Sequence, residues 1–291
     1  MHLEQALHRP IHRIERRPSR YQTSFRLEEL DIWLGEEQPL RLVIKDLSRS
    51  TLSTVALKAK PEFSYDPLRE IAVYETILAG TSSGPPICYA SVGQPDLNQT
   101  WLVLERVPGI ELYQVGSLEV WRTVARWLSA FHASHQSRPP TSKHLLRYDR
   151  VFYLRWLERA LEFTGAPLEP IARRYEDVID LLLALPPTFI HGEFYASNVL
   201  VDGLRVAPVD WEVAAIGPGL VDLAALTTGW DDEARRAIES AYGRISQDAL
   251  DACRLHIALQ WLGWSSEWTP PPEHARDWLS DALAAAQRLG F

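Results

Sequence analysis

Apolar residues in the first third of the chain follow a period of two, which is typical of strands. One helix is expected among these strands. Asp66 is a suitable N-cap, Pro67 presets φ for the first turn, and apolar residues between 68 and 78 share one face before Gly80 ends the pattern. The strand-like runs are residues 24–34, 40–47 and 101–104.

After Pro108 and Gly109 the period changes to that of helices. This change predicts two domains, a β-rich one over residues 1–106 and a mainly helical one over residues 107–291, and therefore an α+β fold class. The expected helices are residues 118–132, 152–163, 171–183, 233–242, 248–264 and 273–289.

A short β insert interrupts the helical part of the chain. The pair Asp202-Gly203 stands between two apolar runs and favours a tight hairpin turn. Such a hairpin brings Asn198 and Asp210 together at its open end. An amide oxygen and a carboxylate suit Mg²⁺, which completes its shell with water and substrate phosphates. Glu193 precedes the hairpin in a loop, from which its carboxylate can act as a base at the same place.

Composition narrows the classes of function. The chain has 291 residues, of which 46% are hydrophobic and 23% charged, so it can bury a substantial core. Its formal charge of −8 argues against a nucleic-acid partner and favours a cationic or neutral one. Cys88 and Cys253 are too few for a disulfide framework or a zinc cluster. The Arg-rich N-terminus lacks an apolar signal core, and no apolar run approaches about 20 residues, so we expect a cytoplasmic protein without a membrane span.

Two motifs stand in a fixed order around the insert. His191-Gly192-Glu193 is followed by four residues and Asn198, and the second motif is Val-Asp210-Trp-Glu. This pair resembles the H-G-D-x-x-x-x-N and I-D-[WFY]-E motifs of the aminoglycoside phosphotransferase and choline/homoserine kinase group, whose fold is that of the protein kinases. The resemblance implies that Asn198 and Asp210 hold Mg²⁺ and that Glu193 replaces the catalytic Asp. Glutamate keeps the carboxylate but displaces it by about one bond length, roughly 1.5 Å.

The same resemblance assigns parts of an ATP site to the N-terminal half. Lys45 ends a β-branched strand, like the lysine that contacts the α- and β-phosphates. Glu70, or Glu75 as the second candidate, resembles the glutamate that pairs with this lysine. Residues 19–24, with Thr23 and Ser24, occupy the position of the phosphate loop although no glycine-rich motif is present. Residues 102–107, with Glu105 and Val107, resemble the hinge whose main chain meets adenine.

Two further residues are expected to hold the loop that follows residue 190. His191 resembles a structural histidine rather than a base. Asp222 resembles the buried aspartate at a helix start that braces the catalytic loop, so we interpret both as supporting residues.

Each of these residues also has a purely structural explanation. Lys45 can protect an edge strand, Glu70 can complement a helix dipole, and Asn198 and Asp210 can form turns at strand ends. Their order along the chain, taken together with their spacing, favours a kinase-like site over a coincidence of structural residues.

The resemblance therefore implies that the chain transfers the γ-phosphate of ATP to a hydroxyl group of a small molecule. The class of acceptor stays open among aminoglycosides, amino alcohols, sugars and natural products, although the net charge favours an amine. Two rival hypotheses are a nucleotide-binding pseudokinase and a binding module that has kept only the fold. The oligomeric state is also left open. Four tryptophans of the helical half either form a cage for an amine or fill the core: Trp230, Trp261, Trp264 and Trp268.

Overall fold

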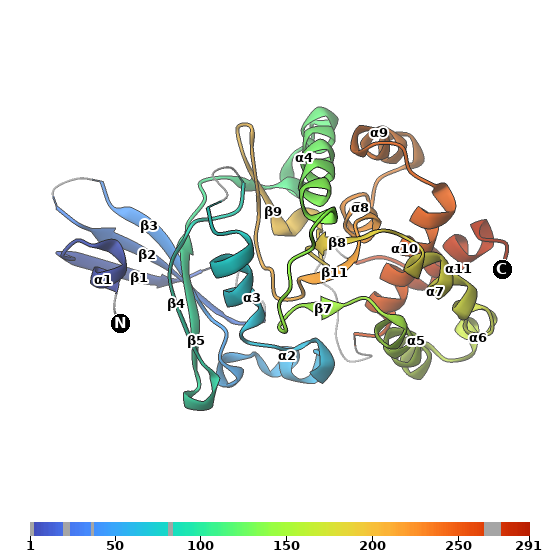
Figure 1. The fold of residues 1–291 in the computed structure, drawn as a ribbon, viewed down its shortest axis with the longest axis horizontal. Helices are drawn as coiled ribbons and strands as arrows, with labels where there is room; N and C mark the ends of the chain where they lie inside the picture. The colour runs from blue at the N-terminus through green and yellow to red at the C-terminus, as the bar shows by residue number, and fades with distance from the viewer. Residues whose placement is uncertain (1–2, 20–23, 36–37, 81–83, 265–274) are drawn as a thin grey trace. The chain divides into compact units, whose positions relative to one another are not determined.

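The computed structural model describes residues 3–19, 24–35, 38–80, 84–264 and 275–291. Packing divides the chain into two compact units. The first unit consists of Met1–Gly109 and Leu200–Glu212, and the second consists of Ile110–Val199 and Val213–Phe291. The hairpin that the sequence predicts within the helical half thus belongs largely to the first unit. Figure 1 labels most of the helices and strands of both units.

The first unit is built on a five-stranded antiparallel sheet with the order β1-β2-β3-β5-β4. Strands in the three expected places are confirmed. Two strands were not expected. The strand β1 is exposed at every residue and shows no alternation of apolar and polar positions, and the apolar residues of β4 do not alternate with polar ones either. The strands are β1 Arg13–Pro18, β2 Arg26–Trp33, β3 Leu40–Asp46, β4 Cys88–Gln94 and β5 Gln99–Glu105.

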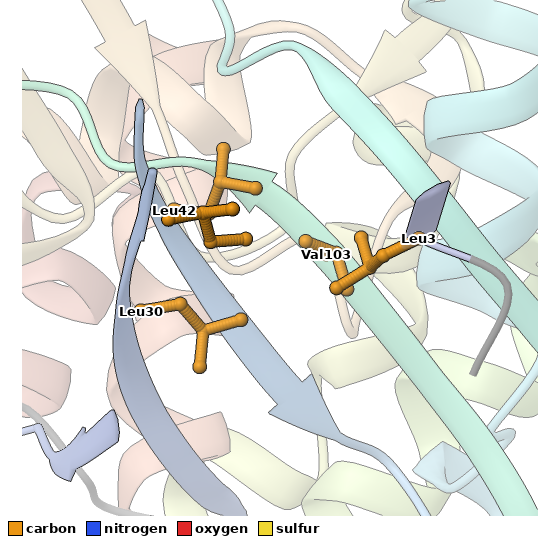
Figure 2. Close-up of a cluster of buried hydrophobic side chains, with 5 residues drawn as sticks. Leu3, Leu30, Leu42 and Val103 are labelled. Carbon is orange, nitrogen blue, oxygen red and sulfur yellow. The ribbon is translucent and has the colours of Figure 1, made fainter. Parts of the chain in front are cut away.

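The two faces of this sheet carry different side chains. Leu30, Leu42 and Val103 come from the three central strands and pack with Leu3 of helix α1 (Leu3–Leu7) on one face, as Figure 2 shows. Because side chains alternate along a strand, Lys45 lies on the other face. A buried apolar face therefore fixes the register of the strand that carries this lysine.

In the part of the first unit that the structure describes, three α-helices accompany the sheet, where the sequence predicts one. Helices α1 and α2 (Thr54–Ala59) are too short for a periodic signal. The expected helix begins later than predicted, because its N-cap is Leu68 rather than Asp66. Asp66 Oδ1 accepts a hydrogen bond from the Leu68 amide at 2.8 Å in the turn before the helix. Its α-helical part, α3, covers only Arg69–Ala72 and continues as a π-helical turn over Val73–Ile77. Such turns are rare and often occur near functional sites.

The second unit is helical, as the period of the sequence predicts. Helix α10 (Gln247–Leu262) is buried on nearly all sides because it packs against α5, α7, α8 and α11. The helix expected over residues 171–183 is interrupted, so α6 and α7 replace it. None of the described helices is long and apolar enough to span a membrane. The other helices are α4 Leu118–Gln136, α5 Arg150–Thr164, α6 Glu169–Ala172, α7 Tyr175–Leu183, α8 Leu220–Leu226, α9 Asp232–Tyr242 and α11 Trp278–Arg288.

The remaining strands are short. A three-stranded sheet with the order β7-β11-β8 supports the second unit. The predicted hairpin is confirmed as β9 and β10, with Gly203 at a φ of 58° in its turn. These strands are β6 Ile110–Glu111, β7 Leu146–Arg147, β8 Pro187–Ile190, β9 Val199–Asp202, β10 Arg205–Pro208 and β11 Ala215–Pro218.

Candidate functional site

Lys45 of β3 extends its ammonium group into a buried cluster of carboxylates in the first unit. Its Nζ donates to Glu70 Oε2 at 2.7 Å and to Asp210 Oδ1 at 2.5 Å. Lys45 is 9% exposed and Glu70 is 1% exposed, so these ion pairs lie largely out of water. A buried lysine requires such partners, because an unpaired charge in the interior is strongly destabilising.

The cluster joins three segments that are far apart in the sequence. Lys45 comes from β3, Glu70 from α3, and Asp210 from the loop after β10. Asp210 has a φ of 66°, a left-handed conformation that aspartate adopts more readily than most residues. The next amide, that of Trp211, donates to Glu70 Oε1 at 3.3 Å. Both oxygens of Glu70 are therefore used. Glu75, the alternative partner for Lys45, instead accepts a hydrogen bond from Ser91.

A second lysine stands beside the first and was missed by the sequence analysis. Lys60 Nζ pairs with Glu212 Oε1 at 2.6 Å, and the side chains are 4% and 11% exposed. The ring of Phe25 lies 5.2 Å from Lys60 Nζ and 5.7 Å from Lys45 Nζ. The only sequence signal was Glu212, the last residue of the second motif. Lys60 follows a helix too short to be predicted, so nothing placed it near this motif.

Burial and neighbouring charges shift the pKa values of Lys45 and Glu70. Burial by itself lowers the pKa of Lys45, but Asp210, Glu70 and Glu212 together outweigh burial and raise it, so the lysine stays protonated. Burial raises the pKa of Glu70 to about 7, and Lys45 offsets only part of this increase. The neighbouring carboxylates Asp210 and Glu212 add to the increase, because two further negative charges disfavour ionisation of Glu70.

The second unit contains the loop that carries the first motif. Asp222 in the first turn of α8 is completely buried. Its Oδ2 accepts from the His191 amide at 2.8 Å, and its Oδ1 accepts from the Gly192 amide at 2.9 Å. His132 of α4 holds this carboxylate from behind, with 3.1 Å from its Nε2 to Asp222 Oδ2 and 2.9 Å from its Nδ1 to the Tyr242 hydroxyl. His132 gave no sequence signal of its own, because it lies on the buried face of a helix.

The loop holds Glu193 through its main chain. The Glu193 amide lies 3.3 Å from His191 Nδ1, and the Glu193 carbonyl accepts from Asn198 Nδ2 at 3.0 Å and from the Tyr195 amide at 2.7 Å. His191 is fully buried, whereas Glu193 is half-buried. The histidine therefore orients the loop from within the core, whereas Glu193 keeps part of its surface exposed.

Asn198 and Asp210 have the donor chemistry that Mg²⁺ requires. Both offer oxygen, which is the ligand atom of hard cations. The side-chain nitrogen of Asn198 is used by the Glu193 carbonyl, so the amide is oriented with its oxygen as the remaining polar atom. Asp210 is half-buried and shares one oxygen with Lys45. Each of these two residues, taken by itself, therefore has the chemistry of a ligand for a magnesium ion that keeps several waters or phosphate oxygens.

The residues expected to form the phosphate loop and the hinge belong to the first unit. Ser24 lies two residues before β2, and its carbonyl accepts from the amide of Ser53, the cap of α2, at 3.0 Å. Thr23 lies outside the described residues. Glu105 is the last residue of β5, and Val107 follows it as a buried residue. The sheet register places Val43 and Leu104 opposite each other on the Lys45 face.

Three of the four tryptophans considered for a cage, Trp230, Trp261 and Trp264, lie in described segments and pack on other rings. Trp261 stacks on Trp278 with centroids 4.9 Å apart, and its Nε1 donates to the Tyr195 hydroxyl at 2.6 Å. Trp230 meets Trp121 edge to face, and both Trp261 and Trp278 are buried. These contacts favour core packing over an open cage. Trp268 lies outside the described residues.

Comparison with known proteins gives the same class. A sequence profile described as "Phosphotransferase enzyme family" matches residues 68–256, which is more than half of the chain. The chain belongs to this phosphotransferase enzyme family, and small-molecule phosphotransferase is the class that the family assignment supports. Among curated proteins, no sequence matches significantly.

Solved structures confirm the kinase-like fold. A choline kinase from Cryptosporidium parvum has a TM-score of 0.62 at 16% identity, with 95% of this chain and 88% of that chain covered. An aminoglycoside 2'-phosphotransferase-IIIa in complex with GDP has a TM-score of 0.58 at 15% identity, with 99% and 95% covered. A macrolide 2'-phosphotransferase from Brachybacterium faecium has a TM-score of 0.59 at 17% identity, with 94% and 91% covered. At these identities the likeness shows the fold alone.

The titration of Glu70 predicts a pH dependence of stability. Its pKa in the folded protein is about 7, above the ordinary value of 4.5, so the folded state binds more protons than the unfolded state between these values. The free energy of unfolding should therefore fall as pH rises from 4.5 to 7, by on the order of 2 kcal/mol from this group. Urea unfolding of wild type and Glu70→Gln at several pH values checks this difference. Glu75→Gln, an exposed site nearby, serves as the control and should follow wild type.

The loop of the first motif predicts a second outcome. Gly192 has a φ of 85°, and a Cβ there would lie 2.6 Å from the Val213 carbonyl oxygen. Gly165 has a similar φ of 75° but no atom within 4 Å of a Cβ. Gly165→Ala should cost about 1 kcal/mol of stability through backbone strain, and Gly192→Ala about 2 kcal/mol more through the clash. Equal losses in denaturant unfolding would show that the loop has room to shift.

Proposed function

We propose that this protein transfers the γ-phosphate of ATP, bound with Mg²⁺, to a hydroxyl group of a small molecule. The observation that carries the proposal is Lys45, which is held in a buried pocket of charge between Glu70 and Asp210. A lysine in this setting keeps its charge and its position, and both are required of a group that neutralises phosphate. Membership of the phosphotransferase enzyme family supports the same reaction.

The nucleotide is proposed to bind the first unit, with its phosphates toward Lys45 and its base toward the residues after β5. Val43 and Leu104 offer an apolar surface on the Lys45 face of the sheet. The main chain at Glu105 and Val107 is proposed to meet the base. Two proteins of similar fold have been solved with nucleotides, the GDP complex described above and a complex with AMP that has a TM-score of 0.62.

Asp210 and Asn198 are proposed to hold the metal. Mg²⁺ would supply positive charge to the phosphate oxygens and so reduce repulsion in the transition state. Lys45 contributes to the same neutralisation and remains protonated, because its neighbouring carboxylates raise its pKa.

Glu193 is proposed to orient the acceptor hydroxyl and to take its proton. The hydroxyl oxygen forms a bond to the γ-phosphorus, the bond from that phosphorus to the bridging oxygen of ADP breaks, and the proton passes to the Glu193 carboxylate. The main chain of Glu193 is fixed by Asn198, Tyr195 and His191. A fixed main chain supports a catalytic role for glutamate in place of aspartate, because only the rotatable bonds of the Glu193 side chain then determine where its carboxylate lies.

The acceptor is proposed to be a small alcohol, and the formal charge of −8 favours one that carries an amine. A panel of choline, ethanolamine, an aminoglycoside and a macrolide samples the acceptors named for proteins of similar fold. Phosphorylation of the acceptor, followed by ³¹P NMR with MgATP, tests the proposal. Binding of MgATP without transfer to any alcohol would instead favour a pseudokinase.

Glu193 variants test the proposed chemistry. Glu193→Gln keeps the shape of the side chain but cannot take a proton, so kcat should fall by about 10²- to 10⁴-fold while the KM for ATP changes little. Glu193→Asp should retain more activity than Glu193→Gln because the carboxylate is kept. Glu158→Gln removes an exposed carboxylate of α5 in the same unit and should leave kcat unchanged. A kcat for Glu193→Gln equal to that of wild type would contradict the role of Glu193.

A further inference from the structure

The guanidinium group of Arg205 in β10 donates hydrogen bonds to residues around the proposed site for the nucleotide base. Its Nη1 and Nη2 donate to Glu105 Oε1 and Oε2 at 2.6 and 2.7 Å. Its Nε donates to the Gly84 carbonyl at 2.9 Å, and Nη2 also reaches the Pro85 carbonyl at 3.2 Å. The Arg205 and Glu105 side chains are 27% and 19% exposed. This is a two-point Arg–carboxylate fork with two additional main-chain acceptors, a geometry that lysine cannot reproduce.

The ion pair between Arg205 and Glu105 changes the main-chain hydrogen bonding at the end of β5. Glu105 donates its amide to the Ile87 carbonyl at 2.8 Å. In a regular antiparallel pair the Ile87 amide would return a bond to the Glu105 carbonyl. Here the Ile87 amide donates to Glu105 Oε2 at 3.1 Å, which is the oxygen that Arg205 also holds. The side chain of Glu105 thus takes a donor that the ladder would otherwise give to its own carbonyl.

The Val107 amide, two residues later, has no hydrogen-bond partner among the described residues. Residues that differ by two in an extended segment direct their main-chain groups to the same side. A carbonyl acceptor at Glu105 and an amide donor at Val107 match the N6 amino donor and the N1 acceptor of adenine. Hypoxanthine has a carbonyl oxygen in place of the amino group and would oppose the Glu105 carbonyl.

We propose that Arg205 and Glu105 form a positioning pair that sets recognition of the purine base, by keeping the Glu105 carbonyl out of the β-ladder. Neither side chain touches the base in this account. The pair acts through the main chain of residues 105–107, and the inference rests on the proposed nucleotide site. It adds a specificity role for Arg205, a residue that belongs to neither sequence motif.

Three ligands distinguish the contribution of the base to binding from that of the phosphates. They are ADP, IDP, which carries hypoxanthine, and inorganic tripolyphosphate, each with Mg²⁺. Calorimetry on the full chain should show that wild type binds ADP at least about 10-fold more tightly than IDP, because one hydrogen bond is replaced by a repulsion between acceptors. In Arg205→Gln the ADP:IDP ratio should fall toward one, while tripolyphosphate binds as in wild type. Glu105→Gln and Arg205→Lys should show the same direction of change.

Arg49 provides the matched control. It makes a two-point pair with Glu62 in the same unit, at 2.7 and 2.9 Å, but the pair is exposed. Arg49→Gln should leave the ADP:IDP ratio unchanged.

A wild type that does not distinguish ADP from IDP, or an Arg205→Gln variant that keeps the ratio, would overturn the inference and leave the proposed phosphotransferase activity intact. Equal weakening of all three ligands in Arg205→Gln would also overturn it, because that result indicates a merely structural role. A wild type that binds none of them would remove the proposed function itself, and the inference with it.

Discussion

The buried ion pairs of Lys45 are the constraint on which the first unit depends. A lysine with carboxylates on both sides is tolerated in the interior only while its partners are in place, and removal of one partner from such a group typically costs about 3–5 kcal/mol. Glu70 and Asp210 come from α3 and from the loop after β10, so the ion pairs require both segments to close on β3. The apolar face of the sheet, around Leu42, fixes the register from the other side.

In the second unit, side chains rather than regular secondary structure hold the loop that carries Glu193. Asp222 does so by accepting two consecutive main-chain amides, and His132 orients that carboxylate in turn. Gly192 is required because its φ of 85° and the nearby Val213 carbonyl leave no room for a side chain. Glu193 is therefore presented by a rigid main chain, and the freedom that its extra methylene adds is confined to the side chain.

Part of the fold and part of the candidate site could be predicted from the sequence, for physical reasons. Strands β2, β3 and β5 alternate clearly because one face is buried, and the Asp202-Gly203 turn defines its hairpin locally. The exposed strand β1 and the π-helical turn after α3 leave no periodic trace. Lys45 and Glu70 were indicated by motif order alone. Lys60, His132 and Arg205 were not, because their importance comes from partners that are distant in sequence, and no local pattern encodes such contacts.

The central claim is that the carboxylate of Asp210, beside Lys45, is part of a site for a metal-bound nucleotide. The most direct measurement is calorimetry of ADP binding with and without Mg²⁺, for wild type and Asp210→Asn. We expect Mg²⁺ to tighten ADP binding to wild type by at least about 10-fold, and we expect this gain to be lost in Asp210→Asn. Equal affinity of wild type for ADP with and without Mg²⁺, or the same gain in the variant, would contradict the claim.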